Sequence, residues 1–259
     1  MWRARAPDPA QVRLLKAARD RFSLYPLSIH VNYLVNLASG DPLIRAKSIE
    51  AFRGELERAA THGAEYLVLH PGSYRGRSIE EGIALFAQGL GEASRGLRAP
   101  GLMVLLENTA CAGCHLGGRL EELLSIRRQA GDLTDLPVGY CLDTCHLLAA
   151  GFDIATGPGL ERAVEQVDEC LGLAQVHLIH ANDSEKPLGS HRDRHAGIGQ
   201  GHIGRDAFRR ILRHPKLRNL PFILETPVKK PHDDRRNLNT LKTLAARTNT
   251  KVRRVMGKS

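Results

Sequence analysis

The chain has 259 residues, which is enough for one large domain or two small ones. Its 37 Lys and Arg against 28 Asp and Glu give a formal net charge of +9; this favours a polyanionic partner such as nucleic acid, although an ordinary basic protein explains the charge equally well. Five cysteines argue against a disulfide scaffold, and no apolar run reaches membrane-spanning length, so we expect a soluble, cytoplasmic protein without a membrane partner.

Apolar periodicity and capping residues predict helices that alternate with short apolar strands. Helices are expected at residues 8–22, 42–62, 78–94, 117–131, 160–172, 205–214 and 234–247. Strands are expected at residues 24–31, 65–70, 102–107, 136–142, 174–180 and 222–225. This alternation indicates an α/β protein built from βα units around a parallel sheet that is buried on both faces. No linker or internal repeat divides the chain, so residues 1–259 are expected to form one domain that ends in a basic tail from about residue 248.

Each predicted strand leads directly to a side chain that can bind a metal ion. In chain order these side chains are His30, His70, Glu107, Asp143, His180 and Glu225. Any one of them is more often a solvated or hydrogen-bonded residue, but six at six strand ends are hard to explain by coincidence. In a barrel the carboxyl ends of the strands converge on one face, where active sites are built. A mixed nitrogen and oxygen donor set suits zinc, with manganese or iron as competitors.

Two further acid–imidazole pairs accompany the strand ends. Asp143 and His146 are three residues apart where a strand gives way to a helix, and Asp193 and His195 lie in the long loop after His180. That loop also carries glycines at 197, 199, 201 and 204 and basic residues at 186, 192 and 194. Glycines allow tight bends or a close approach of the backbone to a phosphate, and basic side chains suit a phosphodiester ligand. A flexible surface loop is the competing interpretation.

Several motifs together resemble endonuclease IV, the zinc-dependent apurinic/apyrimidinic endonuclease family. They occur in family order along most of the chain: His-x-x-Tyr-Leu-x-Asn-Leu at 30–37, Leu-His-Pro-Gly-Ser at 69–73, Leu-Glu-Asn-Thr-Ala at 106–110, Cys-Leu-Asp-Thr-Cys-His at 141–146, Asp-Arg-His at 193–195, Gly-His-Ile-Gly at 201–204 and Leu-Glu-Thr at 224–226. The resemblance implies a (β/α)8 barrel of the TIM type with three zinc ions, manganese being an alternative at one position. It also implies a monomer that acts on double-stranded DNA with abasic sites.

The resemblance implies a role for each motif residue. One zinc would be held by His30, His70 and Glu107; a second by Glu107, Asp143, His180 and Glu225; and a third by His146, Asp193 and His195. Glu107 and Glu225 would be the catalytic carboxylates, the second also orienting the nucleophile. Tyr33 and Leu34 match residues that family members wedge into the duplex, and Arg192 and Arg194 are the expected phosphate contacts. The implied reaction cuts the phosphodiester 5′ to the abasic site and leaves a 3′-hydroxyl and a 5′-deoxyribose phosphate, with trimming of 3′ ends as a second activity.

The start of the chain departs from the family pattern. Trp2 and Arg3 match the family just after its second barrel strand, and the six predicted strands are two fewer than a closed barrel needs. We therefore expect a barrel that lacks the first strand, the first helix and most of the second strand, either because the reading frame begins upstream or because this is a shortened member.

Two other classes of function fit parts of the pattern. A metal-dependent sugar isomerase or epimerase also places His, Asp and Glu at strand ends, but it would need at most two cations, so the Asp193–His195 pair and the positive charge argue against it. A truncated, inactive protein that only binds damaged DNA is the third interpretation.

Overall fold

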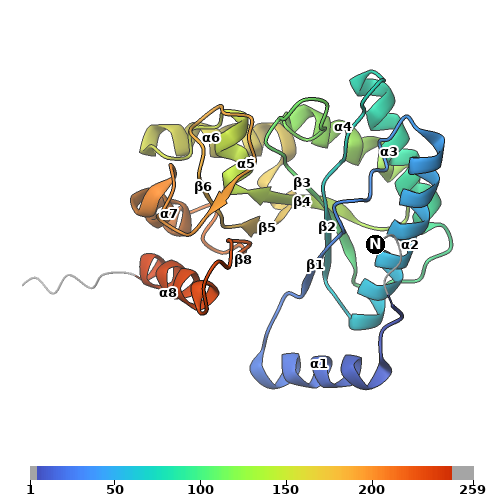
Figure 1. Cartoon of the computed structure of the whole chain (residues 1–259), viewed down its shortest axis with the longest axis horizontal. Coiled ribbons are helices and arrows are strands. Elements are labelled where there is room, and N and C mark those ends of the chain that lie inside the picture. Colours follow the sequence, from blue (N-terminus) through green and yellow to red (C-terminus); the bar gives the residue numbers. More distant parts are fainter. Residues whose placement is uncertain (1–4, 247–259) are drawn as a thin grey trace, which may run out of the picture.

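The computed structural model describes residues 5–246, which form a curled parallel sheet with helices packed on its outer face (Figure 1). The strands are β1 (Ser28–His30), β2 (Tyr66–Leu69), β3 (Met103–Glu107), β4 (Val138–Asp143), β5 (Val176–His180) and β8 (Phe222–Ile223), paired in the order β1-β2-β3-β4-β5-β8. Every neighbouring pair is parallel, which confirms the α/β class and the six predicted strands. The expected basic tail and the Trp2–Arg3 match lie outside the described residues.

The helices follow the strands in the predicted alternation. They are α1 (Pro9–Phe22), α2 (Pro42–His62), α3 (Ile79–Ser94), α4 (Leu120–Gly131), α5 (Thr144–Ala150), α6 (Gly157–Leu171), α7 (Gly204–Arg213) and α8 (Asp233–Ala245), with a 3-10 turn at Leu173–Gln175. Their boundaries follow from local capping: the Asp8, Asp41 and Ser78 side chains accept hydrogen bonds from the first-turn amides of α1, α2 and α3. None of the helices among residues 5–246 is long and apolar enough to cross a membrane.

The first strand is shorter than predicted. Only Ser28–His30 pairs with β2, whereas the apolar run that begins at Leu24 does not join the sheet. Leu24 and Tyr25 are exposed, and Pro26 has no amide to donate to a ladder. The prediction of a strand over residues 24–31 was therefore wrong in its first half. Apolar composition alone did not distinguish an edge segment from a buried strand.

Alternation along the strands divides the core into two parts. Side chains such as Leu67, Leu106 and Leu142 point outward and pack under the helices in the large core. The residues between them point to the concave side, where Val68, Leu105, Cys141 and Leu178 form a small second core. Because side chains alternate with a period of two, the residue two positions after each of these four also points to the concave side.

A short antiparallel pair of strands was not predicted. It joins β6 (Asp183–Ser184) to β7 (His195–Ala196) and closes the loop that follows β5. At two residues each, these strands carry no periodic signal that a sequence could reveal.

Candidate metal centre

The period-two alternation brings the predicted strand-end residues together. Each of the four concave core residues is followed two positions later by a residue that can bind metal. These residues are His70, Glu107, Asp143 and His180. His30 pairs in register with Val68, and Glu225 lies two residues after Ile223, which packs against the same small core. All six side chains therefore emerge at the carboxyl end of the sheet, on its concave side.

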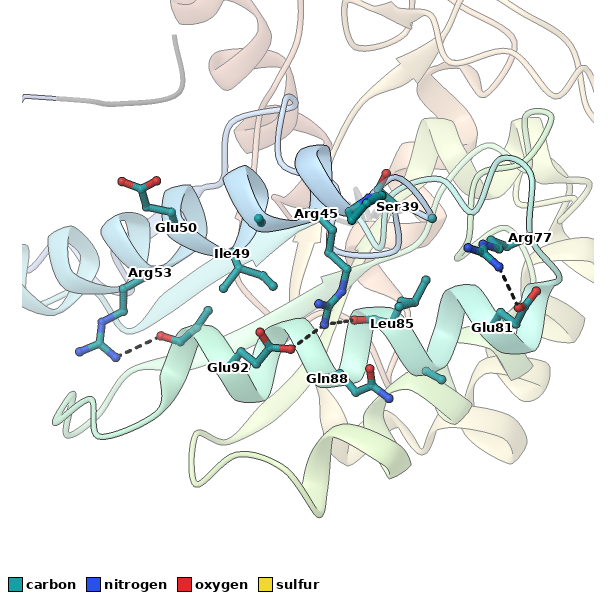
Figure 2. Close-up of a pocket in the computed structure, with 15 residues that line it drawn as sticks. Ser39, Arg45, Ile49, Glu50, Arg53, Arg77, Glu81, Leu85, Gln88 and Glu92 are labelled. Atoms are coloured by element: carbon teal, nitrogen blue, oxygen red, sulfur yellow. Dashed lines mark hydrogen bonds and ion pairs between the residues drawn. The ribbon is translucent and has the colours of Figure 1, made fainter.

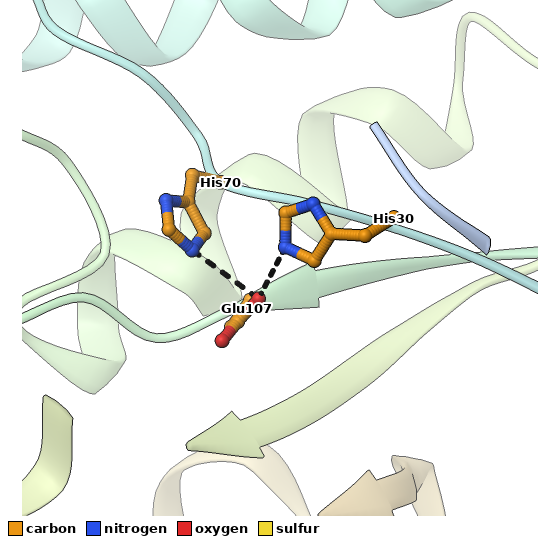
Figure 3. A group of neighbouring side chains, drawn as sticks. All are labelled: His30, His70 and Glu107. Atoms are coloured by element: carbon orange, nitrogen blue, oxygen red, sulfur yellow. Dashed lines mark hydrogen bonds and ion pairs between the residues drawn. The ribbon is translucent and has the colours of Figure 1, made fainter. Parts of the chain in front are cut away.

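Glu107 is the centre of the first group (Figure 3). Its Oε2 lies 2.9 Å from His30 Nε2 and 3.2 Å from His70 Nε2, and its Oε1 lies 3.0 Å from His180 Nδ1. The carboxylate is completely buried. Burial opposes its ionisation, but the surrounding imidazoles, His180 foremost, hold the pKa of Glu107 well below its usual range. Burial likewise opposes the charged form of His30, and the bond to Glu107 outweighs it and raises the pKa of that ring.

A second group shares Glu107 with the first. One ligand atom each from Glu107, Asp143, His180 and Glu225 lies within 4.8 Å of the others. His180 Nδ1 is 3.1 Å from Glu225 Oε2 as well as 3.0 Å from Glu107 Oε1. Burial opposes the charged form of His180, but the Glu107 carboxylate outweighs it and raises the pKa of the ring. Asp143 is completely buried, whereas the Glu225 side chain is 30% exposed and reaches the open side of the group.

The loop closed by β6 and β7 supplies a third group. Asp193 Oδ2 lies 3.2 Å from His146 Nε2, and Asp193 Oδ1 lies 3.2 Å from His195 Nε2. Burial alone would raise the pKa of Asp193, but the two rings lower it; the same pairing raises the pKa of His195 to about 9. Metal-compatible ligand atoms also meet in the sets Asp143–His146–His195 and Cys145–Asp193–His195. All nine predicted ligand residues thus lie in one contiguous cluster.

Three buried polar residues that the sequence reasoning missed support the cluster. The Asn108 side chain accepts a bond from the Asp143 amide (2.7 Å) and donates to the Asp143 carbonyl (3.3 Å), and the Asn182 Nδ2 group donates to Asp143 Oδ2. Asp183 accepts bonds from the amides of Ser184, Ile203 and Gly204 and so anchors the glycine-rich segment to β6. Asn108 directly follows a predicted ligand and Asn182 lies two residues after one, and that position was the only available signal.

Packing explains at least one of the glycines in this segment. A Cβ atom at Gly201 would lie 2.2 Å from the carbonyl oxygen of Ser184 and 2.6 Å from Asp183 Oδ1. Only glycine allows the two backbones to approach this closely. Gly199 and Gly204 have φ values of 77° and 78°, a conformation that favours glycine.

The predicted DNA contacts lie on exposed loops around the cluster. Tyr33 is 89% exposed and the neighbouring Leu34 is partly buried, on the loop that follows β1. This loop borders a cavity of about 530 Å³ that His30 and His70 also line. Arg192 and Arg194 are exposed on the segment before β7, one on each side of Asp193.

A larger cavity lies elsewhere. It has a volume of about 860 Å³ and occupies the outer surface between α2 and α3 (Figure 2). The three arginines that line it already pair with carboxylates or with the backbone, as Arg45 does with Glu92 at 2.8 Å. None of the metal-compatible groups in the described part of the chain lies there, so we place the chemistry at the ends of the strands.

A parallel α/β barrel sheet with clustered His, Asp and Glu at its strand ends defines a metalloenzyme of the TIM-barrel class. Comparison with known proteins agrees: the family described as "Xylose isomerase-like TIM barrel" matches residues 1–246. A "Probable endonuclease 4" of Solibacter usitatus is 71% identical over 245 residues, which cover 95% of this chain and 84% of the relative. A protein of the same name from Chloroflexus aurantiacus is 39% identical over 252 residues, covering 94% and 85%.

Solved structures lead to the same family. The endonuclease IV of Thermus thermophilus superposes with a TM-score of 0.80 at 38% identity, covering 94% of this chain and 84% of that one. A D-tagatose 3-epimerase-like protein superposes at 0.66 with 22% identity, which shows a shared fold alone. This chain belongs to the endonuclease IV family. It is a hydrolase with a metal cofactor, and the resemblance inferred from the motifs is confirmed.

Proposed function

We propose that this protein hydrolyses the phosphodiester bond 5′ to abasic sites in double-stranded DNA and leaves a 3′-hydroxyl and a 5′-deoxyribose phosphate. Trimming of blocked 3′ ends would use the same site. Residues 1–259 would act as one domain, as a monomer, in base-excision repair. The family membership supports the class of reaction, and the side-chain cluster supports the way in which the chain performs it.

The donor set fits three zinc ions, one for each group of side chains. His30, His70 and Glu107 would hold the first; Glu107, Asp143, His180 and Glu225 the second; and His146, Asp193 and His195 the third. The fit rests on charge: a completely buried carboxylate among several imidazoles is otherwise balanced only by protons on the rings, and cations would replace those protons. Imidazole with carboxylate suits zinc, with manganese as an alternative at one position.

Bound zinc would act as a Lewis acid on the phosphoryl oxygens. It would also lower the pKa of bound water, so that hydroxide is available at neutral pH. Glu107 joins the first two groups from a fully buried position, so its role is to hold them at a fixed separation. Glu225 is the carboxylate of the second group that solvent reaches, and it would accept a hydrogen bond from the attacking water and orient it.

The loops around the cluster would hold the DNA. Tyr33 has almost no contact with the rest of the protein, as expected of a side chain that finds its partner in a duplex. Insertion of Tyr33 and Leu34 beside the lesion costs a few kcal/mol of base unstacking, a cost that is lowest where a base is already missing. Arg192 and Arg194 would contact phosphates on either side of the third group.

The third group is the observation that favours this function over a sugar isomerase or epimerase. Asp193 and His195 come from a separate loop and meet His146 beyond the two groups that share Glu107. An isomerase needs at most two cations, whereas three fit the hydrolysis of a phosphodiester, in which attacking and leaving oxygens both require stabilisation.

A direct experiment tests the proposal. The purified protein is analysed for zinc and incubated with a duplex that carries one tetrahydrofuran abasic analogue. We expect about three zinc ions per chain and one nick, 5′ to the analogue, whose 3′ end a DNA polymerase extends. One or two metal ions per chain without a nick would favour the isomerase, and specific binding without a nick would favour the inactive binder.

A further inference from the structure

Asn182 connects two of the clustered carboxylate residues without contacting solvent. Its side chain is completely buried two residues after His180. The Nδ2 group donates to Asp143 Oδ2 at 2.5 Å, and the Oδ1 atom accepts from the Glu225 amide at 2.9 Å. One side chain therefore spans from the end of β4 to the second residue after β8, across β5.

The backbone of Asn182 is held as firmly as its side chain. Its amide donates a hydrogen bond to Thr144 Oγ1 (2.9 Å), and that hydroxyl donates in turn to the Asn182 carbonyl (2.7 Å). Thr144 is the first residue of α5 and directly follows Asp143. Asn182 is thus tied twice to the same corner of the chain, once through the Asp143 carboxylate and once through the backbone.

These contacts leave the Asp143 carboxylate a single orientation. Its Oδ1 accepts from the His146 amide at 2.8 Å as the cap of α5, and its Oδ2 accepts from Asn182. Without the Asn182 N–H, Oδ2 would lose its hydrogen-bond donor, and the carboxylate would keep only the hydrogen bond of Oδ1 to fix its orientation. The Glu225 amide, which lies after β8 in a segment without regular secondary structure, would lose its acceptor at the same time.

We propose that Asn182 is a positioning residue for metal binding, one that sets the orientation of Asp143 and the place of Glu225 for the second metal ion. This inference rests on the proposed function insofar as it takes the cluster to hold metal. Partners that orient metal-binding carboxylates are worth about 10- to 100-fold in metal affinity. We therefore expect Asn182→Ala to weaken zinc binding at the second site by about that factor.

The test measures zinc binding without DNA. Zinc-loaded wild type and Asn182→Ala are titrated against a chromophoric zinc chelator, and the metal that remains after dialysis is counted by mass spectrometry. Should Asn182→Ala not fold, Asn182→Ser carries the same expectation, because its hydroxyl is too short to reach Asp143. Wild-type zinc affinity in a folded variant at position 182 would overturn the proposal.

Asn237 is the matched control for a merely structural effect. It is also a buried asparagine that joins two segments, donating to Thr226 Oγ1 and accepting from the Ile198 amide, each at or near 3 Å. Asn237→Ala should lower the melting temperature and keep the zinc affinity of the wild type. An equal loss of zinc in both variants would show that any buried defect releases the metal, and would overturn a specific role for Asn182.

A double variant tests whether Asn182 acts through Asp143. If it does, Asn182→Ala should cost less zinc affinity in an Asp143→Ala background than in the wild type. Fully additive losses would place the effect elsewhere and overturn the proposal. Zinc binding is measured independently of cleavage, so failure to cut abasic DNA would count against the proposed function and not against the role of Asn182.

Discussion

Replacement of Glu107 by glutamine tests the shared carboxylate on which the cluster depends. The substitution keeps the shape of the side chain and removes one charge from a position that touches four imidazoles, those of His30, His70, His180 and, at 3.5 Å, His146. The rings can become neutral when the charge is lost, so we expect Glu107→Gln to fold and to unfold in one cooperative transition.

The size of the effect on cleavage follows from the sharing. Glu107 belongs to two groups of ligand atoms. Loss of a residue that only orients a ligand costs about 10- to 100-fold. Loss of a ligand itself should cost at least about 100-fold at each of the two sites. The cleavage rate should therefore fall by about 10⁴-fold, which is roughly 5 kcal/mol in the activation barrier.

The assay is single-turnover cleavage of the abasic-analogue duplex by zinc-treated protein, with the zinc content measured in parallel. Glu92→Gln is the matched control. Glu92 forms a partly exposed ion pair with Arg45 on the outer helices, and neither residue belongs to a metal-compatible group among the residues that the structure describes. It should cleave at the wild-type rate. If Glu107→Gln cleaves within tenfold of the wild type, Glu107 does not bridge two metal ions and the reasoning fails.

Four further predictions address the DNA contacts, the supporting loop and the charge of the cluster. Tyr33→Ala should leave the melting temperature unchanged, because the side chain is 89% exposed, and should weaken binding of the abasic duplex by about 1–3 kcal/mol, measured by fluorescence anisotropy. Arg194→Ala should reduce the slope of log affinity against log salt by about 1, whereas Arg98→Ala, exposed before β3 at the opposite end of the sheet, should leave that slope unchanged. Asp183→Ala leaves three amides without their acceptor, two of them buried and the third partly buried, so calorimetry should show a loss of about 3–5 kcal/mol of stability; a loss below 1 kcal/mol would contradict the anchoring role. In metal-free protein the raised pKa of His195 contributes stability that is complete below about pH 6.5 and lost as the pH rises through about 9, up to about 3 kcal/mol, whereas zinc-loaded protein should show no such loss in the same denaturant titrations.

The parts of the fold that the sequence predicted are those with local causes. Helix α2 begins and ends at the predicted residues because Asp41 caps its first turn, Pro42 suits its first position and Gly63 takes the left-handed conformation after its end. The six residues that cluster at the strand ends were found because each follows an apolar strand, a pattern that is readable without tertiary information.

The parts that escaped prediction depend on distant contacts. Whether Leu24 lies in a strand depends on what covers it, and apolar composition does not encode that. Asn182 and Asp183 look like ordinary loop residues in the sequence, and their importance comes from partners at positions 143, 203, 204 and 225. Buried polar residues of this kind need the three-dimensional structure, because the cost of leaving them unpaired is invisible in one dimension.

The spacing between Asp143 and His146 shows how a local rule can serve the assembly of the cluster. Asp143 ends β4 and caps α5, so its Oδ1 binds the His146 amide, and the helix then turns the His146 ring toward Asp193. The bond that starts the helix therefore also sets the distance between the group that contains Glu107 and the group that the loop supplies. A residue that caps a helix in this way cannot be moved along the sequence without moving the imidazole three positions later. We infer that the three-residue spacing between Asp143 and His146 links two metal positions.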